Sequence, residues 1–172
     1  MTTLQMPKVQ QSILSSKDKI ISDLSEILNN DNILSDEDEI RPYETDALAA
    51  YKQKPLIVVL PENVEQVSKI LKYCNENKIK VVPRGAGTGL SGGALPLADS
   101  VLLSMGKFNK ILETDYKNKC VVAQPCVTNL AITHAVQDKK FYYAPDPSSQ
   151  IACSIGGNVA ENSGGVHSLK YG

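Results

Sequence analysis

The fold is decided by one glycine-rich stretch, Pro83-Arg84-Gly85-Ala86-Gly87-Thr88-Gly89-Leu90-Ser91-Gly92-Gly93. This stretch holds five of the chain's 11 glycines, and none of the 11 occurs before position 85. Glycine allows a backbone to take a positive φ or to approach a ligand closely. Because a strand-like run at residues 79–82 comes directly before the stretch, successive N–H groups in the turn can converge on an anion. Thr88 and Ser91 add hydroxyl donors and Arg84 adds positive charge, so the stretch predicts a phosphate or diphosphate site.

Part of this stretch, residues 87–92, also matches the G-x-G-x-x-G pattern of dinucleotide-binding βαβ units. That pattern needs a helix that opens on the glycines, whereas here Pro96 stands where the helix would run. A P-loop is excluded as well, because no Gly-Lys-Ser/Thr ends the cluster. A connector that only turns a corner remains the alternative to an anion site.

A second glycine-rich stretch covers residues 154–165 and contains Gly156, Gly157, Gly164 and Gly165. Small residues alternate there with amides, which suits backbone packed against a flat ring. A tightly packed helix start is the alternative. Two such clusters in one chain suggest one ligand held from two sides.

The rest of the chain mixes helical and strand patterns. We expect helices over residues 16–29, 61–77 and 128–139, and strands over residues 56–60, 79–82, 101–103, 110–113, 120–123 and 141–144. The strands on either side of the second helix form a β-α-β unit, so they are expected to be parallel. The run Pro145-Asp146-Pro147-Ser148-Ser149 is expected to be a rigid turn. The fold class is therefore α+β.

Composition excludes several classes of protein. The chain has 172 residues, of which 42% are hydrophobic and 22% charged, so wholesale disorder is excluded. A net charge of −1 offers no electrostatic case for binding nucleic acid. The four cysteines form no C-x-x-C pair, and His134 and His167 lie apart from any ligand cluster, so no metal site is expected. The longest apolar run, residues 56–60, is too short to cross a bilayer. We therefore expect a cytoplasmic protein with no transmembrane segment.

Three stretches together resemble one known family. Residues 83–94, 144–149 and 154–165 are similar, in this order, to the FAD-binding domain of the vanillyl-alcohol oxidase / p-cresol methylhydroxylase family. The resemblance runs from about Ile40 to Gly172. Within the family, the chain looks like the FAD-linked subunits of bacterial glycolate oxidases, to which D-lactate and D-2-hydroxyglutarate dehydrogenases are close relatives. The 145–149 turn argues against the peptidoglycan-precursor reductases of related fold.

The resemblance implies an organisation of the chain. It implies a two-part FAD-binding domain of the p-cresol methylhydroxylase type over residues 40–172, incomplete at its C-terminus, after an N-terminal helical extension over residues 1–39. In the family the remainder of the FAD domain and a substrate-binding cap domain follow. We therefore expect an N-terminal part of a longer protein, without the residues that bind the substrate carboxylate.

The resemblance also implies a cofactor site, in which the first stretch wraps the FAD diphosphate and the other two lie along the rest of the flavin. The expected FAD-binding residues are Pro83, Arg84, Gly85, Ala86, Gly87, Thr88, Gly89, Ser91, Pro147, Ser148, Ser154, Gly157, Asn158, Ala160 and Gly164. Some members attach FAD covalently through a His at the position of Thr88, so noncovalent FAD is expected here. No catalytic residue is expected in this chain.

Two residues keep open interpretations. Cys126 stands where the glycolate-oxidase-like pattern has Gly, so it is either strained by a positive φ or an ordinary small buried residue. His167 follows the second cluster and can approach the flavin, with simple packing or a hydrogen bond as the alternative.

The function implied for the intact protein is oxidation of a small 2-hydroxy acid, glycolate or D-lactate, to the 2-oxo acid with hydride transfer to flavin N5. The implied partners are other subunits of a glycolate oxidase complex, which would place the protein at the periphery of the inner membrane. This chain alone is expected to be inactive. The alternative is a non-catalytic truncated remnant or split-gene module that binds FAD weakly, or binds only a partner subunit.

Overall fold

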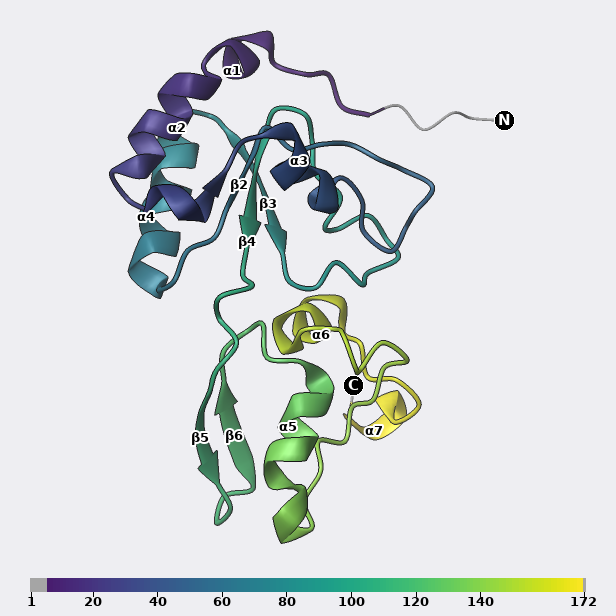
Figure 1. Ribbon diagram of the computed structural model, residues 1–172. Helices are drawn as coiled ribbons and strands as arrows, with labels where there is room; N and C mark the ends of the chain where they lie inside the picture. The colour runs from purple at the N-terminus through teal and green to yellow at the C-terminus, as the bar shows by residue number, and fades with distance from the viewer. Residues whose placement is uncertain (1–5, 172) are drawn as a thin grey trace. The chain divides into compact units, whose positions relative to one another are not determined.

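The computed structural model describes residues 6–171 and divides the chain into two compact units (Figure 1). The first unit consists of the chain up to Pro83 together with Leu90–Ser104. The second unit combines Arg84–Gly89 with the chain from Met105 onward. The first glycine-rich stretch is therefore shared between the two units. The predicted mixture of helices and strands is confirmed.

A four-stranded sheet of order β1-β2-β4-β3 organises the first unit. Its strands are β1 (Ile33–Leu34), β2 (Ile57–Val59), β3 (Lys80–Arg84) and β4 (Ser100–Ser104). β2 pairs with β4 in parallel and with β1 antiparallel, and the arrows of β3 and β4 point the same way in Figure 1. The strands expected to be parallel, β2 and β3, are therefore parallel with β4 between them. All residues of β2 and β4 are buried, as in a sheet covered on both faces.

The helices of the first unit are α1 (Gln11–Ser15), α2 (Lys17–Ser25), α3 (Glu37–Ile40) and α4 (Val64–Glu76), with 3-10 turns at Asn30–Asn32 and Arg41–Tyr43. The helix expected over residues 61–77 is confirmed, with Asn63 as its N-cap. The helix expected over residues 16–29 is confirmed in its first part as α2, which begins directly after Ser16 and ends at Ser25, before its expected end. Both serine hydroxyls donate to backbone carbonyls one turn earlier, a bond that competes with helix continuation.

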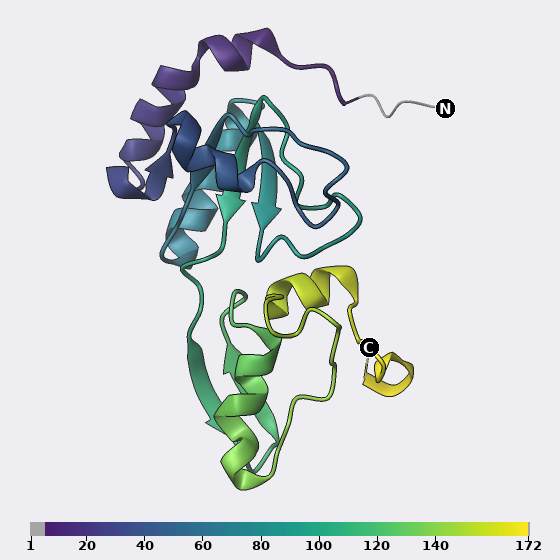
Figure 2. The same cartoon turned by 45° about the vertical axis from the view of Figure 1, so that its right-hand side comes forward.

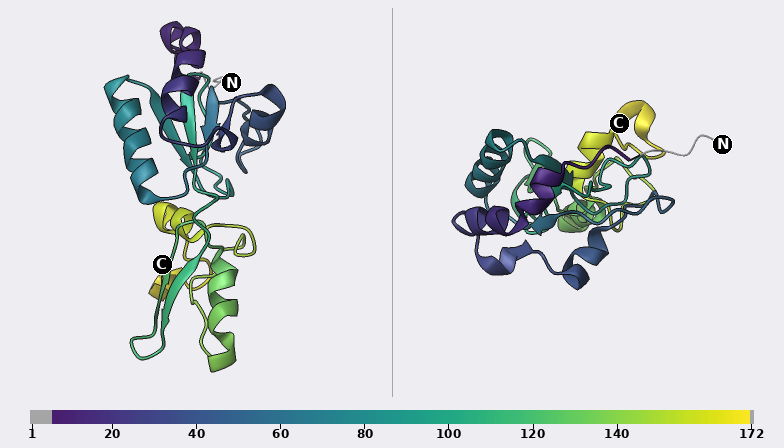
Figure 3. Two further views of the ribbon diagram at one scale, coloured as in Figure 1. Left: turned by 60° about the vertical axis from the view of Figure 1, so that its left-hand side comes forward. Right: turned by 90° about the horizontal axis from the view of Figure 1, so that it is seen from above.

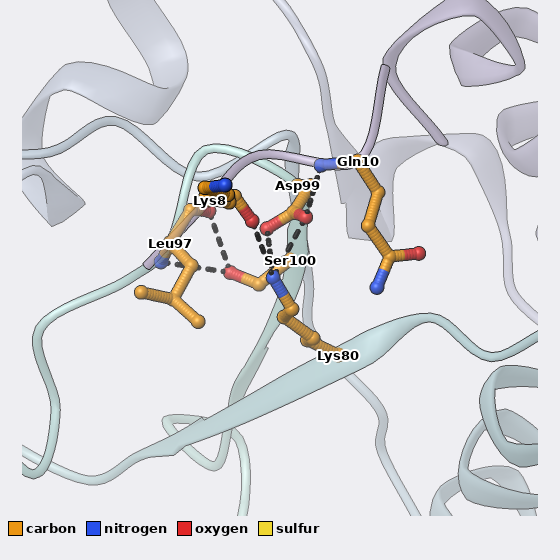
Figure 4. A network of polar contacts seen from close by, with 6 residues as sticks. All are labelled: Lys8, Gln10, Lys80, Leu97, Asp99 and Ser100. Atoms are coloured by element: carbon orange, nitrogen blue, oxygen red, sulfur yellow. Dashed lines mark hydrogen bonds and ion pairs between the residues drawn. The ribbon is translucent and has the colours of Figure 1, made fainter. Parts of the chain in front are cut away.

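A buried ion pair fixes the N-terminal segment to this sheet (Figure 4). The Asp99 side chain is 2% exposed, and its carboxylate accepts hydrogen bonds from Lys80 Nζ at 2.8 and 3.0 Å and from the Gln10 N–H at 2.8 Å. Burial raises the pKa of Asp99, but the Lys80 and Gln10 donors outweigh it and hold the pKa below its ordinary value.

The second unit contains an antiparallel hairpin and three helices. The hairpin strands are β5 (Ile111–Asp115) and β6 (Cys120–Ala123), and the helices are α5 (Asn129–Val136), α6 (Ile155–Glu161) and α7 (Ser168–Tyr171). Figures 2 and 3 show α5 beside the hairpin. The helix expected over residues 128–139 is confirmed, with Gln137–Lys139 as a 3-10 turn.

The strand expected over residues 141–144 is wrong. The N–H of Tyr143 donates to Thr133 Oγ1 at 3.0 Å, and the N–H of Phe141 donates to the Val136 carbonyl at 3.3 Å. These donors are thus used by α5 and are not available to a neighbouring strand.

Candidate functional site

The part of the first glycine-rich stretch in the second unit, Arg84–Gly89, is called the 84–89 loop, and it lies along helix α6. A Cβ built on Gly85 would lie 2.2 Å from Ser154 Oγ, and one built on Gly89 would lie 2.8 Å from Glu161 Oε1. Ser154 is the N-cap of α6 and Glu161 is its last residue. The loop therefore follows the helix from its first turn to its end, and the two predicted glycine clusters meet.

The side chain of Arg84, the first residue of the 84–89 loop, covers the middle of the loop. Gly87 has a φ of +70°, and a Cβ there would lie 2.5 Å from Arg84 Nη2. The guanidinium of Arg84 is thus folded back over Gly87. The loop consequently has a cation at Gly87 and the Glu161 carboxylate at Gly89.

The second glycine-rich stretch forms helix α6 with a tightly packed start. Ser154 is 2% exposed, and its Oγ accepts a hydrogen bond from the Gly157 N–H at 3.3 Å. The Gly156 N–H donates to the Pro125 carbonyl at 2.8 Å, and a Cβ on Gly156 would lie 2.7 Å from Pro125 Cβ. The helix-start interpretation of this stretch is therefore correct for its first half.

The 145–149 turn interlocks with the end of the second stretch. The Asp146 N–H donates to the Gly164 carbonyl at 3.2 Å. Gly165 has a φ of +66°, and a Cβ there would lie 2.2 Å from the Asp146 carbonyl oxygen. His167 Nδ1 lies 3.0 Å from Asp146 Oδ1, within ion-pairing distance. His167 therefore contacts the turn.

Sequence reasoning missed Asn129, which ties this turn to helix α5. Its side chain is 1% exposed, and Nδ2 donates to the Pro145 carbonyl at 2.9 Å. The backbone N–H groups of Asn129 and Leu130 donate to the carbonyls of Cys153 and Gln150 at 3.1 and 3.0 Å. In the sequence, Asn129 is simply the first residue after Thr128, the N-cap of α5, and this position indicates no partner far along the chain.

A hollow of about 200 Å³ opens between helix α6 and the residues before the turn. Its walls include Tyr143, Pro145, Asn158, Ser163 and Gly164. Asn158 is 6% exposed, and among the described residues its Nδ2 has no hydrogen-bond partner. A buried donor without an acceptor is unfavourable, so this side chain fits a ligand oxygen. A second hollow of about 400 Å³, between the hairpin and α5, is lined by none of the predicted FAD-binding residues.

Most predicted FAD-binding residues fall in the second unit. Ten lie on the 84–89 loop, the α6 cap or α6 itself: Arg84, Gly85, Ala86, Gly87, Thr88, Gly89, Ser154, Gly157, Asn158 and Ala160. Pro147 and Ser148 lie on the 145–149 turn, and the Gly164 carbonyl accepts a hydrogen bond from that turn. Pro83 and Ser91 belong to the first unit.

The two interpretations left open for Cys126 are decided by its backbone conformation and its burial. Cys126 is not among the residues with positive φ, so it carries no such strain. It is half-buried, and burial raises the pKa of its thiol.

Over residues 6–171, no group of three His, Cys, Asp or Glu side chains could hold a metal ion. None of the helices within this range has the length and hydropathy that a membrane-spanning helix needs.

Comparison with known proteins gives consistent matches. The family model described as FAD binding domain matches residues 55–172. The chain is 60% identical over 140 residues to glycolate oxidase subunit GlcD of Escherichia coli strain K12, covering 81% of this chain and 28% of that protein. It is 41% identical over 137 residues to the D-lactate dehydrogenase of Anaerostipes hadrus, covering 78% of this chain and 29% of that protein.

Among solved structures, p-cresol methylhydroxylase with bound substrate has a TM-score of 0.70 at 26% identity, covering 88% of this chain and 30% of that one. The chain thus spans less than a third of the length of each of these proteins.

Proposed function

The chain belongs to the FAD binding domain family, and on this basis we propose that it is the FAD-binding part of a flavin-dependent oxidoreductase acting on a small 2-hydroxy acid. The observation that carries the proposal is the 84–89 loop lying along α6 with glycine at each close contact. Two of the relatives it matches are named for glycolate and D-lactate, so these two acids define the proposed substrate class.

The residues present fit a diphosphate-bearing flavin. Gly85, Gly87 and Gly89 leave the loop without side chains on alternate residues, which allows a ligand to approach the backbone closely. The Arg84 guanidinium at Gly87 supplies a charge complementary to a diphosphate. The unpartnered Nδ2 of Asn158 offers a donor to a ligand oxygen.

We propose that the remaining predicted residues serve the same cofactor. Pro83, Ala86, Thr88 and Ser91 would act with the loop. Along the rest of the flavin we place Pro147, Ser148, Ser154, Gly157, Ala160 and Gly164. When bound, FAD supplies a hydride acceptor. The chain's own contribution is to hold and orient this group, and no proton transfer is assigned to its residues.

Three finer statements belong to the same proposal. The FAD is held noncovalently, because Thr88 stands where covalent relatives have His. The partners are further subunits of a glycolate oxidase complex, as the name of the similar bacterial subunit supports. Any contact with the inner membrane is made through those subunits.

Cofactor binding is tested by titrating the purified chain with FAD and following flavin fluorescence. We expect saturable binding, weakened at least about tenfold by Gly87→Val, which adds a branched side chain where φ is +70°. A chain that is folded by circular dichroism and shows no binding up to about 1 mM FAD would overturn the proposal.

The substrate class is tested with a chimera. The matching segment of the Escherichia coli GlcD subunit is replaced by this chain, and oxidation of glycolate and D-lactate is measured with a dye acceptor. We expect activity on at least one of the two acids. A chimera that retains FAD and oxidises neither would contradict the assigned substrates.

A further inference from the structure

Glu161 places a carboxylate beside the last glycine of the 84–89 loop. Its Oε1 and Oε2 lie 2.8 and 3.7 Å from the position of a Cβ on Gly89. Both oxygens therefore face the same point of the loop. Among the described residues, no hydrogen bond or ion pair involves this carboxylate.

Helix stability does not explain this carboxylate. Glu161 is the last residue of α6, and a negative charge at a helix C-terminus opposes the helix dipole. Asn162, which follows it, already closes the helix in the left-handed conformation that suits this position.

The position also conflicts with a loop that binds only phosphate. Two like charges about 4 Å apart repel by about 1 kcal/mol in water and several times more near a protein surface. A phosphate at Gly89 would meet that repulsion, whereas one at Gly87 would meet the Arg84 guanidinium. An ionised carboxylate only accepts hydrogen bonds, so the group that fits beside Gly89 is a donor such as a hydroxyl.

We propose that Glu161 accepts hydrogen bonds from the sugar hydroxyls that adjoin the diphosphate of the bound dinucleotide. The loop then distinguishes a sugar-linked diphosphate from a bare one. This inference rests on the proposed function, because it assumes FAD as the ligand. FAD carries hydroxyls on both sides of its diphosphate, on the ribityl chain and on the ribose, and the shared chemistry is a vicinal diol. The same pairing of a carboxylate with a ribose hydroxyl recurs in other dinucleotide sites.

The test uses calorimetric titration of the chain and its Glu161→Ala and Glu161→Gln variants with FAD, FMN, ADP and inorganic pyrophosphate. Glu113→Gln is the matched control, since Glu113 is an exposed acid on β5 of the same unit and its substitution removes the same charge. We expect Glu161→Ala to weaken FAD at least about tenfold, as expected for a lost charge-assisted hydrogen bond. We expect the same substitution to strengthen the binding of pyrophosphate about two- to fivefold, because it removes a negative charge that repels this ligand.

The opposite signs separate recognition from structure. Glu161→Gln, which keeps an acceptor without the charge, should weaken FAD less than Glu161→Ala. If Glu161→Ala weakens the binding of FMN as well as FAD, the hydroxyls that Glu161 contacts are those of the ribityl chain. If it weakens the binding of ADP as well as FAD, they are those of the ribose.

The contrary results are equally distinct. The inference is overturned if the Glu161→Ala variant binds FAD as tightly as the control variant, or if its affinities for FAD and pyrophosphate fall equally. In both cases the proposal that the unmodified chain binds FAD still stands. An unmodified chain that binds no FAD overturns both proposals.

Discussion

The Cα of Gly85 lies against the hydroxyl group of Ser154, so closely that a Cβ on Gly85 would lie 2.2 Å from Ser154 Oγ. Ser154 is buried and caps helix α6, so it has little room to move. The first glycine of the loop is therefore required by packing against the second glycine-rich stretch, in addition to any ligand. This contact is the physical link between two sequence motifs that lie far apart in the chain.

Gly85→Ala should destabilise the chain by about 1–3 kcal/mol through overpacking. Ser154→Gly removes the hydroxyl that the new methyl group meets, and glycine at an N-cap costs only a few tenths of a kcal/mol. The double variant should therefore be nearly as stable as Ser154→Gly alone, with a coupling energy of about 1 kcal/mol or more in urea denaturation. Strictly additive free energies would show that the two residues do not meet as described.

Gly165→Ala should be more harmful than Gly92→Ala, although both glycines have positive φ. A Cβ on Gly92 meets only Leu48 Cδ2 at 3.8 Å, so its cost is the left-handed conformation, about 1–2 kcal/mol. A Cβ on Gly165 would also lie 2.2 Å from the Asp146 carbonyl, which adds about 1–3 kcal/mol of strain. The free energies of unfolding of both variants give the comparison. Equal losses would contradict the interlocked turn.

The sequence alone predicts the elements whose signals are local. The buried run around Ile57 forms a strand and the helix expected over residues 61–77 is found as α4, because each has its signal within its own residues. The failures have long-range or competing causes. The Ser25 hydroxyl donates to the Ser22 carbonyl where α2 ends before its expected end, and the N–H groups of residues 141 and 143 are taken by α5.

The candidate site divides in the same way. Glycine spacing predicts that the loop approaches something closely, and the meeting with α6 confirms that the two clusters come together. The partners that fix the geometry, Pro145 for Asn129 and Gly89 for Glu161, depend on how distant segments pack. Spacing along a chain cannot specify such pairs.

Asp99→Asn should remove a pH-dependent part of the stability. Because the folded-state pKa of Asp99 is lowered, the carboxylate contributes stability at neutral pH that is lost as the pH falls below about 4. We expect Asp99→Asn to be about 2 kcal/mol less stable than the unmodified chain at pH 7, and this difference to shrink below about pH 4. Glu65→Gln, which breaks an exposed pair with Lys69, is the control and should leave the stability nearly unchanged, because solvent screens an exposed pair. A difference that does not change with pH would contradict the role given to the Asp99 charge.

Denaturation of the FAD-loaded chain should release all of its flavin. Thr88 has no imidazole nitrogen to form the covalent bond that some relatives make, so we expect only noncovalent contacts to hold the cofactor. After acid precipitation, the yellow colour should remain in the supernatant. A fluorescent protein band on a denaturing gel would disprove noncovalent binding.

Asn129→Ala should weaken FAD binding more than its effect on folding explains. The substitution leaves the Pro145 carbonyl without its donor, at a cost of about 1–3 kcal/mol, and frees the turn that carries Pro147 and Ser148. Thr133→Val is the matched control, because it removes the acceptor of the Tyr143 N–H from the same helix and should cost a similar amount. Urea denaturation and FAD titration are measured on both variants. We expect comparable losses of stability but a FAD affinity at least about fivefold lower for Asn129→Ala than for Thr133→Val. Equal FAD affinities of the two variants would show that Asn129 supports the fold without positioning the turn that carries Pro147 and Ser148.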